Sequence, residues 1–452
     1  MDPVSSWQRF SADPKDDPAM QRLFEFTTHI VSPGELGSFS QITPARLRDS
    51  PAEESDGVVV IKSASTSEET STEPHDIYRE LRILAQCSHS NIIQILGHSF
   101  GEVNDTLHFW MPHIPYCLSS LLDCPSFVPS YVVAEDDLAG HSSGDPLDGF
   151  AILAKALIFQ LVSALAYLHD PAQNVAHRDI KPTNVLITAT GLVKLVDFGV
   201  SWSERISPSS DCLWPEPPGR LCFDVSSGPY RAPELLFGAR NYDPYATDLW
   251  SLGALCAEFF TSIKTVESDS DFDSEEEDDD NPHRMSLFNA DRGSIGLAWS
   301  VFQIRGTPTA ENWPDFTALP DGSKVSFQEV PPIDLKTILP NKLLGSHPVF
   351  TGSHSPPAEA SDSPIDLMYR LLLYPPEHRL QAKNAMQHPW FTSGALVLPR
   401  DYPADLGGSV VRDSRTNLAD ILAVFIAGND EAPSGVYENF QDEEDYAGID
   451  GE

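Results

Sequence analysis

The sequence predicts an α+β fold with a small β-rich lobe followed by a larger helical lobe. Between residues 21 and 112, short β-branched or aromatic runs ("FTTHIV", "GVVVIKS", "TLHFWM") alternate with turns, which is typical of strands. We expect one helix among them, in "EPHDIYRELRILAQC", with Pro74 at its start. After residue 113 the pattern is mostly helical, with long loops at 125–149, 200–228 and roughly 262–286.

We expect four segments along the chain: an extension at 1–20, the β-rich lobe at 21–112, the helical lobe at 113–392 with an acidic insert at about 262–286, and an acidic tail at 393–452. The most apolar segment, residues 151–170, contains Lys155 and Gln160, and its large residues recur on one helix face (Leu153, Leu157, Leu161, Leu165 and Leu168). It therefore predicts a buried helix rather than a membrane span. The tail holds one short amphipathic stretch, "NLADILAVFIAG".

The net charge of −38 is unevenly distributed along the chain. Residues 267–280 carry ten acidic side chains and residues 429–452 carry nine, so these two segments hold half of it. Such runs are typical of solvated segments, although the serines of the first run, each followed three residues later by an acid, are also candidate phosphorylation sites. The remaining body is still acidic, which argues against nucleic-acid binding.

The six cysteines show no C-x-x-C pair and no metal-ligand spacing. In a chain of this size they predict reduced thiols in an intracellular protein of the nucleus or cytoplasm. The first residues, "MDPVSSWQRFSADPKDD", contain no apolar core, so we expect no secretory signal.

The strongest chemical signal is "HRDIKPTN" (177–184), followed by "DFG" (197–199) after a hairpin with Gly191 at its turn. Phosphoryl transfer requires a carboxylate that accepts the proton of the attacking hydroxyl and oxygen ligands that fix Mg²⁺ on the phosphates. The two motifs supply Asp179, Asn184 and Asp197 in this order and spacing. The pattern therefore indicates phosphoryl transfer.

On these motifs the chain resembles the eukaryotic protein kinases, over about residues 21–392. The resemblance implies the bilobal protein kinase fold, with ATP and Mg²⁺ as cofactors. It implies that Asp179 is the catalytic carboxylate, Asn184 and Asp197 are metal ligands, and Lys181 neutralises the γ-phosphate. Lys62 of "VVIK" would bind the α- and β-phosphates and pair with Glu80. It further implies structural roles for Arg178, Phe198, Gly199, Ser227, Arg231, Glu234 and its partner Arg379.

The resemblance also locates the nucleotide pocket. The segment "SPGELGSFSQI" (32–42) is a reduced phosphate loop in which Gly37 aligns with the middle glycine and Ser40 replaces the third. Pro112 falls where a backbone N–H usually donates to adenine, unless the register shifts by one residue. Adenine binding would then depend on carbonyl groups and apolar packing. The ATP-binding residues we expect are Lys62, Gly37, Ile42, Val60, Phe109 as gatekeeper, Met111, Leu186 and Val196.

"SSGPYRAPELLFG" and "RGTPTAENWPDF" resemble the cyclin-dependent-kinase (CMGC) branch, with three departures. No cyclin-docking helix motif precedes Glu80. The activation segment runs from Asp197 to Glu234, 37 positions further on, and Cys222, followed two positions later by Asp224, stands where the activating threonine is expected. Arg79 and Arg178 match two phosphate-binding arginines, but the third position is Trp202.

These departures resemble the fungal single-subunit kinases that activate cyclin-dependent kinases. The resemblance implies a monomeric serine/threonine kinase whose protein substrate is a cyclin-dependent kinase, and which requires neither a cyclin nor activation-segment phosphorylation. Two alternatives stay open: a kinase of polymerase C-terminal repeats, and a pseudokinase that binds partners without catalysis. We expect no nucleic-acid or membrane partner.

Overall fold

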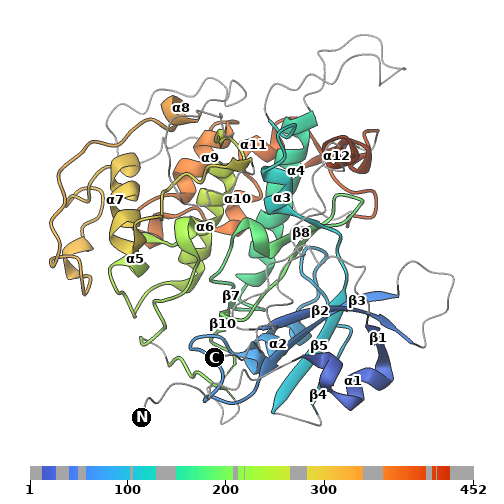
Figure 1. Cartoon of the computed structure of the whole chain (residues 1–452). Helices are drawn as coiled ribbons and strands as arrows, with labels where there is room; N and C mark the ends of the chain where they lie inside the picture. Colours follow the sequence, from blue (N-terminus) through green and yellow to red (C-terminus); the bar gives the residue numbers. More distant parts are fainter. Residues whose placement is uncertain are drawn as a thin grey trace, which may run out of the picture.

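The computed structural model confirms an α+β architecture with a small β-rich lobe and a larger helical lobe (Figure 1). It describes residues 13–26, 40–48, 57–101, 105–128, 149–206, 212–217, 219–264, 282–339, 360–403, 410–413 and 415–427. Most of the phosphate loop, including Gly37, lies outside these residues, as do the acidic run at 267–280 and the acidic end at 429–452.

The small lobe is a five-stranded sheet of order β1-β2-β3-β5-β4, in which all neighbours are antiparallel. Its central strand carries Lys62, which lies opposite Ile42 on one side and Phe109 on the other. One face packs on α1 (Pro18–Leu23) through a small core of Met20, Phe24, Ala45, Val59 and Ile61. The strands are β1 (Phe24–Phe26), β2 (Gln41–Leu47), β3 (Val58–Ser65), β4 (Gly97–Phe100) and β5 (Thr106–Pro112).

The helix of the small lobe is α2 (Ile77–Gln86), which begins three residues later than the predicted start at Pro74. Asp76 is its N-cap, and its carboxylate accepts a hydrogen bond from the Arg79 N–H at 3.0 Å. An acidic N-cap satisfies a free N–H at the helix start, so the cap and not the proline fixes the boundary. Of the predicted strand "FTTHIV", only Phe26 is described, as the last residue of β1.

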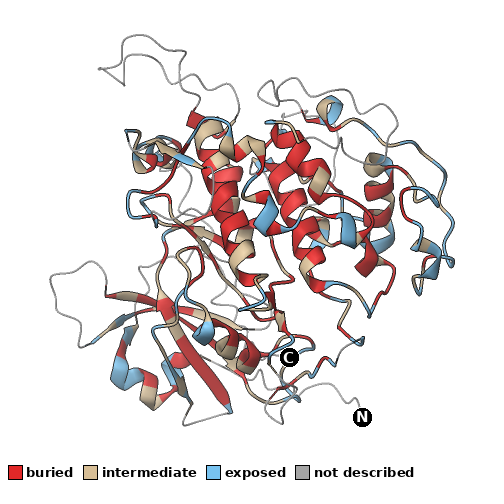
Figure 2. Ribbon diagram, turned by 180° about the vertical axis from the view of Figure 1, so that it is seen from behind, coloured by how far each residue is buried: buried red, intermediate tan, exposed pale blue. Residues whose placement is uncertain are grey.

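The large lobe is built around buried helices, above all α4 and α6, which form the interior in Figure 2. Pro244 follows the capping Asp243 at the start of α6, an arrangement suited to a helix N-terminus. The helices of this lobe are α3 (Leu118–Leu122), α4 (Gly149–Leu168), α5 (Pro233–Leu236), α6 (Pro244–Glu258), α7 (Gly293–Arg305), α8 (Leu335–Ile338), α9 (Pro364–Leu371), α10 (Ala382–Ala385), α11 (Pro389–Thr392) and α12 (Leu418–Ala427).

Helix α4 is the predicted apolar helix, and among the described residues it alone has the length and composition of a membrane span. Its apolar window is 72% buried inside the protein, as expected of a core helix. Part of the predicted tail also belongs to this core. Strand β13 (Ala395–Val397) pairs in parallel with β14 (Val411–Asp413), and α12 packs on α4 with Leu418, Leu422 and Phe425 buried.

Short strands between the lobes position the predicted chemical motifs. Strand β8 (Val185–Ile187) pairs with β6 (Tyr116–Cys117) and β9 (Val193–Leu195), and Gly191 adopts a φ of 82° in the turn after β8. Strand β7 (Val175–Ala176) pairs with β10 (Trp202–Ser203). The remaining pair is β11 (Ile263–Lys264) with β12 (His283–Arg284). The loop that carries "HRD" therefore leads into β8, and "DFG" follows β9, the neighbour of β8 in the same small sheet.

Candidate active site

A buried carboxylate on α6 fixes the backbone of the loop that carries Asp179. Asp248 accepts hydrogen bonds from the backbone N–H groups of His177 at 2.8 Å and Arg178 at 2.6 Å. Arg178 has a φ of 64°, a left-handed conformation that a non-glycine residue adopts only when its surroundings enforce it. His177 bonds the Val196 carbonyl through Nε2 at 3.0 Å and accepts the Asp179 N–H at Nδ1. The loop is therefore fixed before any substrate binds.

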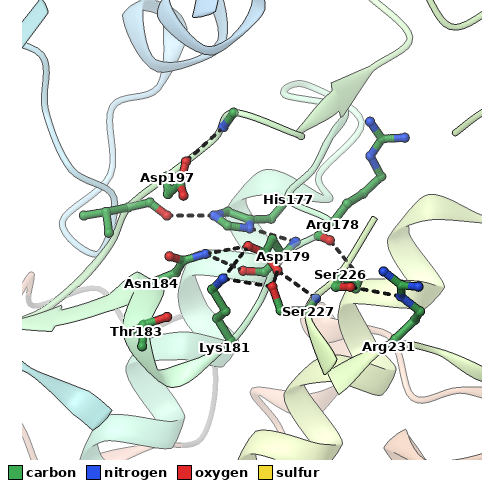
Figure 3. Close-up of polar contacts among 12 residues, drawn as sticks. His177, Arg178, Asp179, Lys181, Thr183, Asn184, Asp197, Ser226, Ser227 and Arg231 are labelled. Carbon is green, nitrogen blue, oxygen red and sulfur yellow. Dashed lines mark hydrogen bonds and ion pairs between the residues drawn. The ribbon is translucent and has the colours of Figure 1, made fainter. Parts of the chain in front are cut away.

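Asp179 lies at the centre of a polar network (Figure 3). Its Oδ1 accepts hydrogen bonds from the N–H of Ser227 at 3.0 Å and from the hydroxyl at 2.8 Å. Its Oδ2 lies 3.2 Å from the ammonium of Lys181 and accepts a bond from Asn184 Nδ2 at 3.0 Å. Lys181 also donates to the Ser227 hydroxyl at 2.8 Å. Three other predicted site residues thus meet around the Asp179 carboxylate.

A second cluster joins the two lobes through Lys62. Its ammonium lies 2.8 Å from Glu80 Oε1 on α2 and 2.7 Å from Asp197 Oδ1. Glu80 also accepts the N–H of Phe198 at 3.1 Å. A Cβ at Gly199 would lie 3.2 Å from Asp197 Oδ1, so only glycine leaves this carboxylate uncrowded. The three charged residues predicted to act together do lie together.

The charges of this cluster stabilise one another. Burial acts to lower the pKa of Lys62, but attraction to Asp197 and Glu80 outweighs it and raises that pKa above the ordinary value. Burial acts to raise the pKa of Asp197, but the charge and hydrogen bond of Lys62 outweigh it and lower that pKa. Both groups are therefore charged at neutral pH.

The residues predicted to hold Mg²⁺ suit a hard cation. Asp197 offers an ionised carboxylate with 40% of its side chain exposed. Asn184 makes both of its bonds to Asp179 through the amide nitrogen, which leaves the amide oxygen as a ligand. Mg²⁺ takes oxygen ligands and is commonly bound by one or two carboxylates together with substrate phosphates. No ready-made group of three or more His, Cys, Asp or Glu ligands occurs among the described residues, so phosphates would have to complete the site.

The apolar residues predicted to enclose adenine all belong to the main hydrophobic core or pack against it: Val60, Phe109 and Met111 are buried in it, and Ile42, Leu186 and Val196 are partly buried against it. Pro112 ends β5, and the next backbone donor, the N–H of His113, bonds the Val58 carbonyl at 3.3 Å. A register shift to His113 would therefore offer no free donor. A cavity of about 40 Å³ beside Lys62, lined also by Ser40 and His75, lies at the phosphate end.

The end of the activation segment is tied to both the catalytic loop and the large lobe. Ser226, with a φ of 65°, donates from its hydroxyl to the Arg178 carbonyl at 2.7 Å, and its own carbonyl accepts from Arg231 Nε at 3.0 Å. Glu234 and Arg379 form a buried pair through two bonds of 2.7 Å. Asp224 bonds only Arg231 among the contacts found in the described structure, and its side chain is 74% exposed.

The residue that the sequence did not single out is Glu216. Its carboxylate bonds Arg79 and Arg178, the two arginines matched to a phosphate site. It also accepts the N–H of Cys222 at 2.7 Å. Neither Cys222 nor Asp224 contributes a side chain to these arginines, so the anion of this site lies six residues before the predicted position. In the sequence, Glu216 is a single acidic residue inside the apolar stretch "LWPEPP". An acidic side chain in such a stretch is expected to be buried only together with a partner, and this pattern could have indicated its role.

The fold and the two clusters are those of a protein kinase, and the family model "Protein kinase domain" matches residues 37–391. The chain belongs to the protein kinase family.

Its relatives include cyclin-dependent kinases. It is 32% identical to cyclin-dependent kinase 20 of Rattus norvegicus over 242 residues, 54% of this chain and 55% of that protein. It is 26% identical to cyclin-dependent kinase 11 of Dictyostelium discoideum over 355 residues, 77% and 76% of the two chains. The chain thus spans about half of the length of the first of these relatives.

A solved structure shares the fold. A chain of the yeast RNA Pol II CTD kinase CTDK-1 complex superposes with a TM-score of 0.53 at 21% identity, covering 86% of this chain and 96% of that one. This structure shows the fold alone, whereas the family model and the relatives support a cyclin-dependent-kinase-like serine/threonine kinase. They do not bear out the finer resemblance to fungal single-subunit activating kinases.

Proposed function

We propose that the chain transfers the γ-phosphoryl group of ATP to serine or threonine hydroxyls of proteins. The observation that carries the proposal is that Lys62 contacts Glu80 and Asp197 while Asp179 contacts Lys181, Asn184 and Ser227, so both halves of the site are assembled at once. A protein that only bound partners would have no need of these seven charged and polar groups in this arrangement.

Each residue then has one task. Asp179 orients the substrate hydroxyl and takes its proton, while Lys181 faces the transferring phosphoryl group. Lys62 holds the phosphates from the small lobe, and Glu80 holds Lys62. Mg²⁺, bound by Asp197 and Asn184 together with ATP, would neutralise the developing charge on the phosphate oxygens. The apolar side chains of Val60, Leu186 and Val196 would enclose the base.

The substrate we propose is the activation segment of a cyclin-dependent kinase, phosphorylated without a cyclin and by a monomer. Support comes from the segment itself, which offers Cys222 and no hydroxyl at the predicted activating position and is already bonded to the catalytic loop. Six cysteines without a disulfide suit the nuclear or cytoplasmic location that such a substrate requires.

One observation favours a second substrate class. Because the carbonyl of Ser226 already accepts a hydrogen bond from Arg231, it is a weaker acceptor for a substrate N–H that passes beside Ser227. A substrate N–H left without a partner is disfavoured, whereas proline has no N–H to leave unpaired. A peptide rich in Ser-Pro steps, such as a polymerase C-terminal repeat, is therefore the second candidate.

The test is phosphate transfer by the purified chain with Mg-ATP, to a monomeric cyclin-dependent kinase and to a Ser-Pro repeat peptide, each with and without an added cyclin. We expect transfer to the loop threonine of the kinase without a cyclin, and loss of about 10²- to 10⁴-fold in the Asp179→Asn variant. Preferential transfer to the repeat peptide would favour the second class. No Mg-dependent ATP binding and no transfer to either substrate would leave the pseudokinase alternative.

A further inference from the structure

Two buried arginines of the kinase meet at a single carboxylate. Glu216 Oε1 accepts hydrogen bonds from Arg79 Nη1 and from Arg178 Nη2, each at 2.7 Å. The two nitrogen atoms therefore lie within about 5.4 Å of each other. Glu216 Oε2 bonds Arg178 Nη1 at 2.7 Å, which makes the contact with Arg178 bidentate. The side chains of Arg79, Arg178 and Glu216 are 5%, 0% and 4% exposed.

Each arginine stands next to a residue of the active site. Arg79 precedes Glu80 on α2, and Arg178 precedes Asp179 in the catalytic loop. Glu216 also accepts the Cys222 N–H at 2.7 Å, and Tyr242 donates to the Cys222 carbonyl at 2.6 Å while bonding Arg178 at 3.2 Å. One carboxylate thus joins the helix of the small lobe, the catalytic loop and the activation segment.

Electrostatics makes this carboxylate necessary to the arrangement. Two guanidinium groups this close, and almost fully buried, repel each other unless an anion lies between them. Burial acts to raise the pKa of Glu216, but its bonds to Arg178 and its attraction to both arginines lower that pKa to about 2, so the group is ionised at any physiological pH. The carboxylate of Glu216 is shared by two arginines and a backbone N–H, whereas Asp76, 3.8 Å from Arg79, faces only one of the arginines.

We propose that Glu216 is a positioning residue for phosphate transfer, a built-in anion that holds α2, the catalytic loop and the activation segment in the active arrangement without phosphorylation. The proposal rests on the proposed kinase function. Arg79 also donates to the Trp214 carbonyl and Arg178 donates from Nε to the Val200 carbonyl at 2.8 Å, so both arginines keep anchors when the carboxylate is removed. The expected loss is therefore of position and not of the fold.

Three variants of the full chain test this. Glu216→Gln keeps the size and removes the charge, Glu216→Ala opens an anion-sized gap, and Glu204→Gln is the matched control. Glu204 lines the same small cavity as Glu216 but is exposed and bonds Asn174 instead of the arginines. All proteins are treated with a phosphatase first, so that no added phosphate can substitute for the carboxylate.

We expect Glu216→Gln and Glu216→Ala to lower kcat about 10- to 100-fold, the loss expected from charge-assisted hydrogen bonds, with a smaller change in the KM for ATP. Added formate should restore part of the activity of Glu216→Ala but not of Glu216→Gln, which has no gap to fill. Glu204→Gln should match the wild type. Amide hydrogen exchange in residues 219–231 should be faster in both Glu216 variants.

Wild-type kcat and exchange in Glu216→Gln would overturn the proposal, and so would an Ala variant that formate does not restore. Should the wild type itself transfer no phosphate, the proposed function fails, and hydrogen exchange alone then decides whether Glu216 holds the segment.

Discussion

The buried carboxyl group of Glu258 should make the free energy of unfolding of this kinase fall as the pH rises. One substitution should abolish this dependence on pH. Glu258 ends α6 and is 6% exposed, and its Oε2 accepts a hydrogen bond from the Tyr230 hydroxyl at 2.5 Å. Burial raises the pKa of Glu258 to about 7, although the Tyr230 hydrogen bond and Arg284 act to lower it. We therefore expect Glu258→Gln, which is neutral at every pH and still accepts from Tyr230, to remove a pH-dependent destabilisation.

The sign and size follow from linkage. Because the folded pKa lies above the unfolded value of 4.5, the contribution to stability is fully present below pH 4.5 and is lost as the pH rises through about 7. At about 1.4 kcal/mol per pKa unit the whole contribution is about 3 kcal/mol, of which about 2.5 kcal/mol is lost between pH 5 and pH 8. The free energy of unfolding of Glu258→Gln, relative to wild type, should rise by that amount over this interval.

Urea unfolding of both proteins at pH 5 and pH 8 measures this quantity. Comparing variant with wild type at each pH cancels the other titrating groups. Glu377→Gln, the same substitution at an exposed position, should leave the difference from wild type unchanged between the two pH values. If Glu258→Gln is destabilised by an equal amount at both, Glu258 is ionised in the folded protein and the reasoning from burial is wrong.

Three further predictions concern the site and the core. Lys62→Met should lower the rate of phosphate transfer at least about 10²-fold, because it removes the ammonium that pairs with the buried Glu80. Transfer near the wild-type rate would contradict a role of the Lys62–Glu80 pair in the reaction. Arg379→Met should lower the free energy of unfolding by about 3–5 kcal/mol, because Glu234 is then buried without its partner. Adding Glu234→Leu should recover part of this loss of stability. If it recovers none, the broken ion pair is not the cause of the loss. Phe425→Ala should cost about 3–5 kcal/mol in urea unfolding if α12 belongs to the core, and under 1 kcal/mol if it is a loosely attached tail.

The parts of the site that the sequence predicts are those fixed by short stretches of backbone. Asp179 and Asn184 lie five residues apart and meet within one loop. Asp197 follows the β8–β9 hairpin, whose turn at Gly191 the sequence marks. The repeated leucines predict the buried helix α4, because apolar residues that recur with the helical period indicate a buried helix face.

The parts that it does not predict depend on caps and on long-range pairing. The start of α2 is set by Asp76, whose second oxygen accepts the N–H of Leu213 in the activation segment, so tertiary contacts help to fix a local boundary. Glu216 meets Arg79 across 137 residues of sequence. It lies in an irregular, proline-flanked loop without a repeating period, and counting back from Arg231 cannot show how such a loop folds.

Two carboxylates close to Cys222, those of Glu216 and Asp224, bond arginines, and their surroundings decide which of them holds the activation segment. Asp224 and Arg231 are 3.0 Å apart, but 74% of the Asp224 side chain faces solvent, where an ion pair contributes about 0–1 kcal/mol and is screened by salt. The carboxylate of Glu216 is buried, so water cannot replace its two arginine partners. Separating it from these arginines therefore costs far more free energy than breaking the exposed pair of Asp224 and Arg231. The order of the segment is then set when the chain folds and not by a later modification at Cys222. On this proposal a phosphatase would have nothing to remove at position 222.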